Sequence, residues 1–122
     1  MSKNKPTVVI GASPNSDRYS YKATISLQQH QQTVYPVGIR TGKINDLDII
    51  TDKPHLVNID SVTLYVGPNN QAPWMDYIFS LKPKRIIFNP GTENPEFETL
   101  AESKGIEALK ACTLVLLSIN KY

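Results

Sequence analysis

The chain of 122 residues is 40% hydrophobic and 20% charged, which is typical of a soluble globular domain large enough to bury a hydrophobic core. Its formal net charge of +2 is too small to indicate nucleic-acid binding, and no apolar segment is long enough to predict a signal peptide or a membrane span. The single cysteine, Cys112, excludes an internal disulfide and a cysteine metal cluster. We therefore expect one cytoplasmic domain over residues 1–122.

Predicted strands and helices alternate along the chain. Short, mostly apolar runs, typical of strands covered on both faces, lie at residues 7–10, 33–37, 61–66, 85–88 and 106–109. Helical patterns lie between or after them, at residues 20–31, 71–81, 95–104 and 113–119. This alternation predicts an α/β fold: a Rossmann-like, doubly wound, mostly parallel sheet of about five strands in a three-layer α/β/α arrangement.

Two of the predicted helices begin at residues suited to capping. Ser20 is a suitable N-cap for the first helix, and Asn94 for the third. Residues 38–60 have the least regular pattern of the chain. There we expect a short strand at residues 48–51 and a turn or short helix at residues 55–56.

The most informative motif follows the first predicted strand directly, where Gly11, Ala12 and Ser13 precede a helix. A glycine permits a sharp turn and close approach of the backbone to a phosphate, and the positive end of a helix dipole favours negative charge there. Arg18 adds a fixed positive charge with several donors. We predict that backbone N–H groups of residues 11–13 and of the first helix bind a phosphate. The alternative is a plain turn beside a solvated arginine.

The turn after the second predicted strand is basic, because it carries Arg40 and Lys43 and no carboxylate occurs between Asp17 and Asp46. A dehydrogenase with the G-x-G-x-x-G fingerprint needs an acidic residue in this region for the ribose 2′-hydroxyl, and only the first glycine, Gly11, is present. A basic turn instead suits a phosphorylated ribose, as in NADP or coenzyme A. An exposed loop without a ligand is the alternative.

Two further loops lie at the same edge of the predicted sheet, where doubly wound folds bind their ligands. Gly67 and Pro68 begin one loop, and the backbone at Gly67 has room to lie beside an adenine or a pantetheine arm. The other loop contains Gly91 and ends at Asn94, which is placed to present helix N–H groups to a ligand. Ordinary turn chemistry also explains each of these residues taken singly.

No residue stands out as a catalyst. His30 and His55 have no carboxylate partner at a telling spacing, and Cys112 precedes an apolar segment, so structural roles explain all three. The sequence also contains no metal-ligand spacing, nucleophile elbow or Walker loop.

Several segments in a characteristic order resemble those of a known family. They are Val9-Ile10-Gly11-Ala12-Ser13, Arg18-Tyr19-Ser20-Tyr21, Val34-Tyr35-Pro36-Val37, Pro90-Gly91-Thr92-Glu93-Asn94, Gly105-Ile106 and Ala111-Cys112-Thr113. Together they look like the small bacterial coenzyme A-binding proteins, which are stand-alone Rossmann domains similar to the N-terminal domain of the succinyl-CoA synthetase α-subunit. The resemblance covers nearly the whole chain.

The resemblance implies binding of coenzyme A or an acyl-CoA. It implies that the pyrophosphate side of the ligand is held by Gly11, Ala12, Ser13 and Arg18. Ser20 and Tyr21, in the segment that resembles the family's phosphate-side loop, are further candidate cofactor-binding residues. It implies that the adenosine end is held by Val37, Gly38, Arg40 and Lys43. The chain departs from the family at Gly38-Ile39, where an Asn-Pro pair is usual, and at Asn89-Pro90-Gly91, where a Gln-Gly pair is common. The phosphorylated histidine of the synthetase belongs to a second domain, so that chemistry does not carry over.

We therefore predict a protein that binds coenzyme A or an acyl-CoA non-covalently, without catalysis of its own. One alternative is an NADP-binding, reductase-like protein, and another is a protein-interaction module with a vestigial nucleotide pocket. No nucleic-acid or membrane partner is expected, and a homodimer or a partner enzyme is compatible with every one of these functions.

Overall fold

The structure, a computed structural model, describes residues 3–122. Its elements in chain order are β1 (Thr7–Ile10), α1 (Tyr19–Gln29), β2 (Val34–Val37), β3 (Lys43–Ile44), β4 (Leu47–Asp48), β5 (Ser61–Leu64), the 3-10 helix η1 (Pro68–Asn70), α2 (Ala72–Ser80), β6 (Arg85–Phe88), α3 (Pro95–Ser103), β7 (Glu107–Lys110) and α4 (Thr113–Ser118). Within residues 3–122, no helix combines the length and the apolar content needed to cross a membrane.

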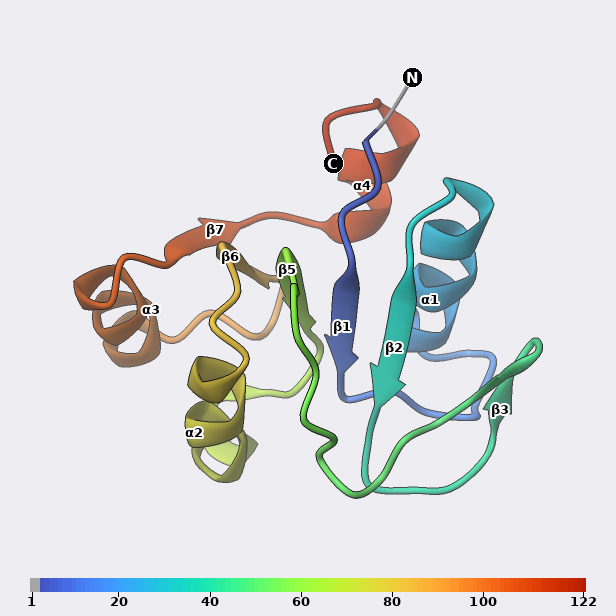
Figure 1. The fold of residues 1–122 in the computed structure, drawn as a ribbon, viewed down its shortest axis with the longest axis horizontal. Coiled ribbons are helices and arrows are strands. Elements are labelled where there is room, and N and C mark those ends of the chain that lie inside the picture. The colour runs from blue at the N-terminus through green and yellow to red at the C-terminus, as the bar shows by residue number, and fades with distance from the viewer. Residues whose placement is uncertain (1–2) are drawn as a thin grey trace.

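Five strands form one parallel sheet in the spatial order β2-β1-β5-β6-β7, while β3 and β4 form a separate antiparallel hairpin (Figure 1). The chain passes from β1 to β2 on one side and later continues with β5 on the other side of β1. The strand order therefore reverses between β1 and β5, and folds of this kind bind ligands at that switch point. The predicted Rossmann-like, doubly wound α/β fold is confirmed.

Side chains alternate along each strand and so face two separate cores. Val8 of β1 faces the core beneath α2 and α3, which contains Phe97. Val9, its neighbour, faces the core beneath α1 and α4, where it packs with Leu27 and Leu117. These five side chains are almost completely excluded from solvent. Helices on both faces of the sheet complete the three layers.

The strands of the large sheet and all four α-helices lie within one or two residues of their predicted bounds. Residues 38–60 differ from the prediction. Instead of a strand at residues 48–51, the chain forms the β3–β4 hairpin, because Asn45 adopts a φ of +55° that suits its tight turn. Ile50 then makes a single parallel bridge with Val37, and residues 55–56 contain no helix.

The prediction that Ser20 caps α1 is wrong. The N-cap is Arg18, because the preceding turn brings the chain into helical geometry earlier, with the Arg18 N–H donating to the Asn15 carbonyl at 3.1 Å. Ser20 lies inside the helix and is buried, and its carbonyl accepts a hydrogen bond from Thr24 Oγ1 at 2.8 Å. The side chain of Arg18 makes no capping hydrogen bond.

Candidate functional site

A cleft of about 1170 Å³, which we call the carboxyl-edge cleft, lies beyond the carboxyl ends of β1, β2 and β5 at the switch point of the sheet. The predicted site residues that line it are Gly11, Ala12, Ser13, Arg18, Ser20, Gly38, Arg40, Gly67 and Gly91. Those that do not line it are Tyr21, Val37, Lys43, Pro68 and Asn94. The ligand-binding roles of all of them stay predictions.

The turn after β1 requires glycine. Gly11 has a φ of +95°, and a Cβ atom there would lie 2.9 Å from the carbonyl oxygen of Tyr65. The N–H groups of Gly11 and Ala12 both donate to the Val37 carbonyl oxygen at 3.0 Å. These two N–H groups thus extend the hydrogen bonding between β1 and β2 beyond the strands, and the predicted phosphate-binding role of the turn remains a prediction.

The amino end of α1 is where the chain leaves helix N–H groups open to a ligand. No side chain caps this end, and its first turn contains no acidic residue. Tyr19 and Ser20 of the same turn line the cleft. At the amino end of α3, in contrast, Asn94 Oδ1 accepts from the Phe97 N–H, and two glutamates occupy the first turn. Within the first turn of α1, no acidic side chain offsets the positive end of the helix dipole.

Gly38 allows the loops after β1 and β2 to touch. A Cβ atom at Gly38 would lie 2.3 Å from the carbonyl oxygen of Ala12, far inside van der Waals contact. Any larger residue, such as the asparagine usual in the related family, requires the two loops to separate. The close approach of the Ala12 carbonyl therefore explains why this chain has glycine at position 38, where asparagine is usual in the family.

Positive charge predominates in the carboxyl-edge cleft. The cations that line it are Arg18, Arg40 and Lys53, and within residues 3–122 the one carboxylate that lines it is Asp17. A concave surface with this balance attracts polyanions. Sequence reasoning missed Lys53, because it lies in the irregular residues 38–60, where no motif indicated its distance from the strand ends.

Lys43 lies elsewhere. Its ammonium group is 2.8 Å from Asp48 Oδ1 across the β3–β4 hairpin, and both side chains are largely exposed. The hydrogen bond to Asp48 raises the pKa of Lys43 above its usual value, so the lysine stays charged but is already paired. The sequence signal for Lys43, its place soon after the second strand, did not reveal the hairpin.

Two side-chain amides, one buried and one half-buried, fix the loops on the far side of the cleft. Gln71 Nε2 donates to the carbonyls of Val66 and Thr92 at 2.9 and 2.7 Å, and its Oε1 accepts from Asn94 Nδ2 at 2.9 Å. Asn94 is thus committed to capping α3, as predicted, and to orienting Gln71. These bonds hold the η1 and β6–α3 loops at a fixed separation.

Tyr65, directly after β5, forms part of the cleft floor. Its hydroxyl is buried without a hydrogen-bond partner among the described residues. Burial raises the pKa of Tyr65 well above its usual value, so the phenol is neutral at physiological pH. Tyr65 therefore adds no charge to the cleft.

The residues considered for catalysis lie outside the cleft. His30 closes α1 at the other edge of the sheet, with Nδ1 2.7 Å from the Ser26 carbonyl, and His55 is exposed in the loop before β5. Cys112 is partly buried at the start of α4. Residues 3–122 contain no group of three or more histidine, cysteine or acidic side chains placed to hold a metal ion.

The fold and the site together define a doubly wound α/β protein with a basic cleft at its switch point. The family model described as "CoA binding domain" matches residues 5–118. The chain belongs to this family, and binding of coenzyme A is the function that the family supports.

Solved structures share the fold closely. A crystal structure described only as that of an uncharacterized protein is 44% identical, with a TM-score of 0.97, and the match covers 99% of this chain and 100% of the other. A hypothetical protein from Pyrococcus horikoshii OT3 is 22% identical with a TM-score of 0.82, covering 93% and 81%. A protein from Thermus thermophilus is 18% identical with a TM-score of 0.81, covering 98% and 91%. No curated protein matches the chain.

Proposed function

We propose that this protein binds coenzyme A, free or acylated, non-covalently in the carboxyl-edge cleft, and that it catalyses no reaction of its own. Residues 1–122 would act as one binding unit in the cytoplasm. The observation that carries the proposal is the uncapped amino end of α1 facing a cleft lined by three cations and one carboxylate. Coenzyme A carries a pyrophosphate and a ribose 3′-phosphate, so it matches a site with separated positive groups.

The proposed binding mode uses the two ends of this charge distribution. The pyrophosphate lies at the amino end of α1, where free helix N–H groups, the Ser13 hydroxyl and Arg18 favour an anion. Arg40, in the loop after β2, binds the phosphorylated ribose, because doubly wound folds bind the ribose near the end of that strand. The pantetheine arm then extends past Gly67 and Gly91, beyond β5 and β6.

The side chains of the cleft support binding rather than catalysis. Among residues 3–122, the titratable side chains that line it are Asp17, Arg18, Tyr19, Arg40, Lys53 and Tyr65. No histidine or cysteine is among them, and Asp17 is exposed at the rim. A general acid–base catalyst needs a group positioned and tuned for proton transfer, which this set does not supply.

Calorimetric titration with coenzyme A, dephospho-coenzyme A, NADP and NAD at matched salt tests the proposal. We expect heat from coenzyme A, weaker binding of dephospho-coenzyme A, and little binding of the two nicotinamide nucleotides. Preferential binding of NADP would replace the proposal with a reductase-like function. If none of the four binds, the cleft is not a nucleotide site and a role in protein interaction takes its place.

A further inference from the structure

We propose, resting on the function above, that Lys53 is the lysine that distinguishes coenzyme A from its dephosphorylated form. In this proposal Lys53 exchanges its contacts with Pro73 and Trp74 for the ribose 3′-phosphate, which it binds together with Arg40. Lys53 is a specificity-determining residue that the sequence pattern did not reveal, and Lys43 has no part in this contact.

The backbone brings Lys53 to the ribose side of the cleft. Ile50 and Val37 form a parallel bridge, with the Gly38 N–H donating to the Ile50 carbonyl at 3.0 Å. The two segments therefore leave the sheet in the same direction, at its carboxyl edge. Arg40 lies three residues beyond Val37 and Lys53 three residues beyond Ile50, and both line the cleft. Two cations on neighbouring parallel segments suit a single phosphate group.

The side chain of Lys53 bridges this segment and the first turn of α2. Its ammonium group donates to the Pro73 carbonyl at 2.8 Å and lies 4.9 Å from the centre of the Trp74 ring. The Lys53 backbone has a φ of +50°, in the left-handed region, and the residue is exposed. Exposed cation–π contacts are weak, whereas a charge-assisted bond to a phosphate dianion is strong, so the exchange favours the ligand.

Lys43 is the rival for this role, and its surroundings argue against it. Its ammonium group is paired with Asp48 at 2.8 Å on the hairpin, and it does not line the cleft. Moving it to a ligand would break that pair as well as reposition the hairpin. Lys53 gives up only contacts with a neutral carbonyl and a neutral ring.

The test compares the affinities of coenzyme A and dephospho-coenzyme A in three variants. Lys53→Met keeps the aliphatic stem and removes the charge. Lys43→Met tests the rival, and Lys82→Met is the matched control, since Lys82 is also exposed with a φ of +50° but lies outside the cleft. We expect Lys53→Met to lower the preference for coenzyme A by about tenfold, because the variant should bind coenzyme A more weakly and dephospho-coenzyme A with unchanged affinity. The other two variants should keep the wild-type preference.

Trp74, the only tryptophan of the chain, supplies a second readout. Departure of the Lys53 ammonium from its ring changes the fluorescence, so in the wild type coenzyme A should alter the emission more than dephospho-coenzyme A does. In Lys53→Met the two ligands should act alike.

The outcomes separate the two proposals. If the wild type binds neither ligand, the proposed function itself fails. If it binds both and Lys53→Met keeps the wild-type preference, or Lys43→Met loses it instead, the assignment of Lys53 is overturned while the proposed function stands.

Discussion

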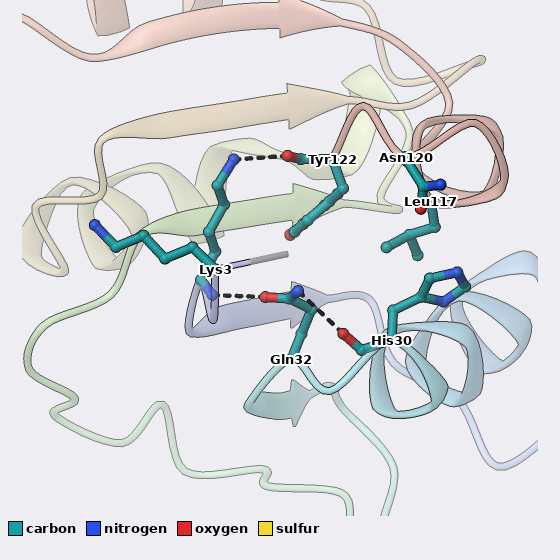
Figure 2. Close-up of a pocket in the computed structure, with 7 residues that line it drawn as sticks. Lys3, His30, Gln32, Leu117, Asn120 and Tyr122 are labelled. Atoms are coloured by element: carbon teal, nitrogen blue, oxygen red, sulfur yellow. Dashed lines mark hydrogen bonds between the residues drawn. The ribbon is translucent and has the colours of Figure 1, made fainter. Parts of the chain in front are cut away.

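At the amino edge of the sheet, opposite the carboxyl-edge cleft, a smaller pocket of about 550 Å³ is lined by Lys3, Lys5, His30, Gln32, Leu117, Asn120 and Tyr122 (Figure 2). The polar groups here bind one another. Lys5 Nζ donates to the Tyr122 carbonyl at 2.6 Å, and the Gln32 side chain accepts from the Lys5 N–H and donates to the His30 carbonyl. The pocket groups of Lys5, Gln32 and Tyr122 are thus bonded within the chain.

The carboxyl edge is different. The amino end of α1 has no side-chain cap there, and the ammonium group of Lys53 contacts only a carbonyl and an aromatic ring. Both edges carry cations and a hollow, so charge and shape alone do not distinguish a ligand site from a structural one. What distinguishes them is whether the polar groups are free to bind a ligand. Substitutions at the amino edge should therefore lower the stability of the fold, and substitutions at the carboxyl edge should weaken ligand binding.

The largest expected effect comes from a place where the carboxyl edge is itself tightly packed. Gly38→Ala should lower the free energy of unfolding by about 3 kcal/mol, because its Cβ atom would lie 2.3 Å from the Ala12 carbonyl oxygen. Urea denaturation measures the loss. Gly67→Ala is the control, since nothing lies within 4 Å of its added Cβ, and it should change stability by less than about 0.5 kcal/mol. Equal stability of the two variants would show that the loops after β1 and β2 separate easily.

Charge removal at the two edges tests the comparison directly. Arg18→Ala, at the carboxyl edge, should weaken coenzyme A binding about tenfold without changing stability, because a charge-assisted contact to phosphate is lost. Lys3→Ala, at the amino-edge pocket, removes the same charge and should change the affinity by less than about twofold. Calorimetric titration of both variants measures the difference. Similar losses would mean that only long-range charge matters.

Removal of a hydroxyl group at the amino edge should lower stability and leave ligand affinity unchanged, the opposite of the effect expected for Arg18→Ala. The Tyr122 hydroxyl is 2.6 Å from Thr7 Oγ1, which itself donates to the Lys5 carbonyl at 2.7 Å. Tyr122→Phe removes this hydrogen bond and should lower the free energy of unfolding by about 1 kcal/mol while leaving coenzyme A affinity unchanged. A double-mutant cycle with Thr7→Val should show coupling between the two hydroxyls. Strictly additive losses would contradict a direct bond.

The smallest effect concerns the loop that carries Lys53. The Tyr77 hydroxyl of α2 donates to the Pro54 carbonyl at 2.7 Å, and burial, with a smaller contribution from the charge of Asp52, raises the pKa of Tyr77 to about 12. A raised pKa means that the neutral phenol stabilises the fold fully below about pH 10, and that this contribution is lost as the pH rises toward 12.

The free energy of unfolding of Tyr77→Phe should therefore decrease less steeply with rising alkaline pH than that of the wild type. Urea unfolding from neutral pH to about pH 11 measures the difference between the two proteins. Identical slopes would mean that the hydroxyl titrates equally in the folded and unfolded chains. The buried Tyr65 and Tyr122, whose pKa values burial also raises, are present in both proteins and cancel in the comparison.

The elements of the sheet could be predicted because they depend on short windows of sequence. Four-residue, mostly apolar strands such as β1 and β6 are covered on both faces, and such runs are distinctive. Asn94 before Pro95 is a complete local signal for a helix start, and the cap is where it was predicted. Ser20 offered the same kind of signal, but the bond from the Arg18 N–H to Asn15 started the helix earlier.

The position of the candidate site could be predicted from the sequence, but the hydrogen bonds of its backbone could not. A glycine-containing turn after β1 followed by a helix indicates an anion site, and the cleft does lie at that turn. The sequence could not show that the Val37 carbonyl accepts from both Gly11 and Ala12, because the three residues come from two strands that only the sheet brings together.

By itself, then, the sequence determined the α/β alternation, the glycine turn after β1 and the basic character of the chain after β2, all of which follow from neighbouring residues. Only the tertiary structure decided which lysine reaches the cleft. Lys43 is held on a hairpin by Asp48, whereas the bridge between Val37 and Ile50 brings the segments that carry Arg40 and Lys53 to one edge of the sheet, where both residues line the cleft. The physical reason is that the position of a charge relative to a ligand depends on how the sheet brings distant segments together, and no local pattern of residues contains that information.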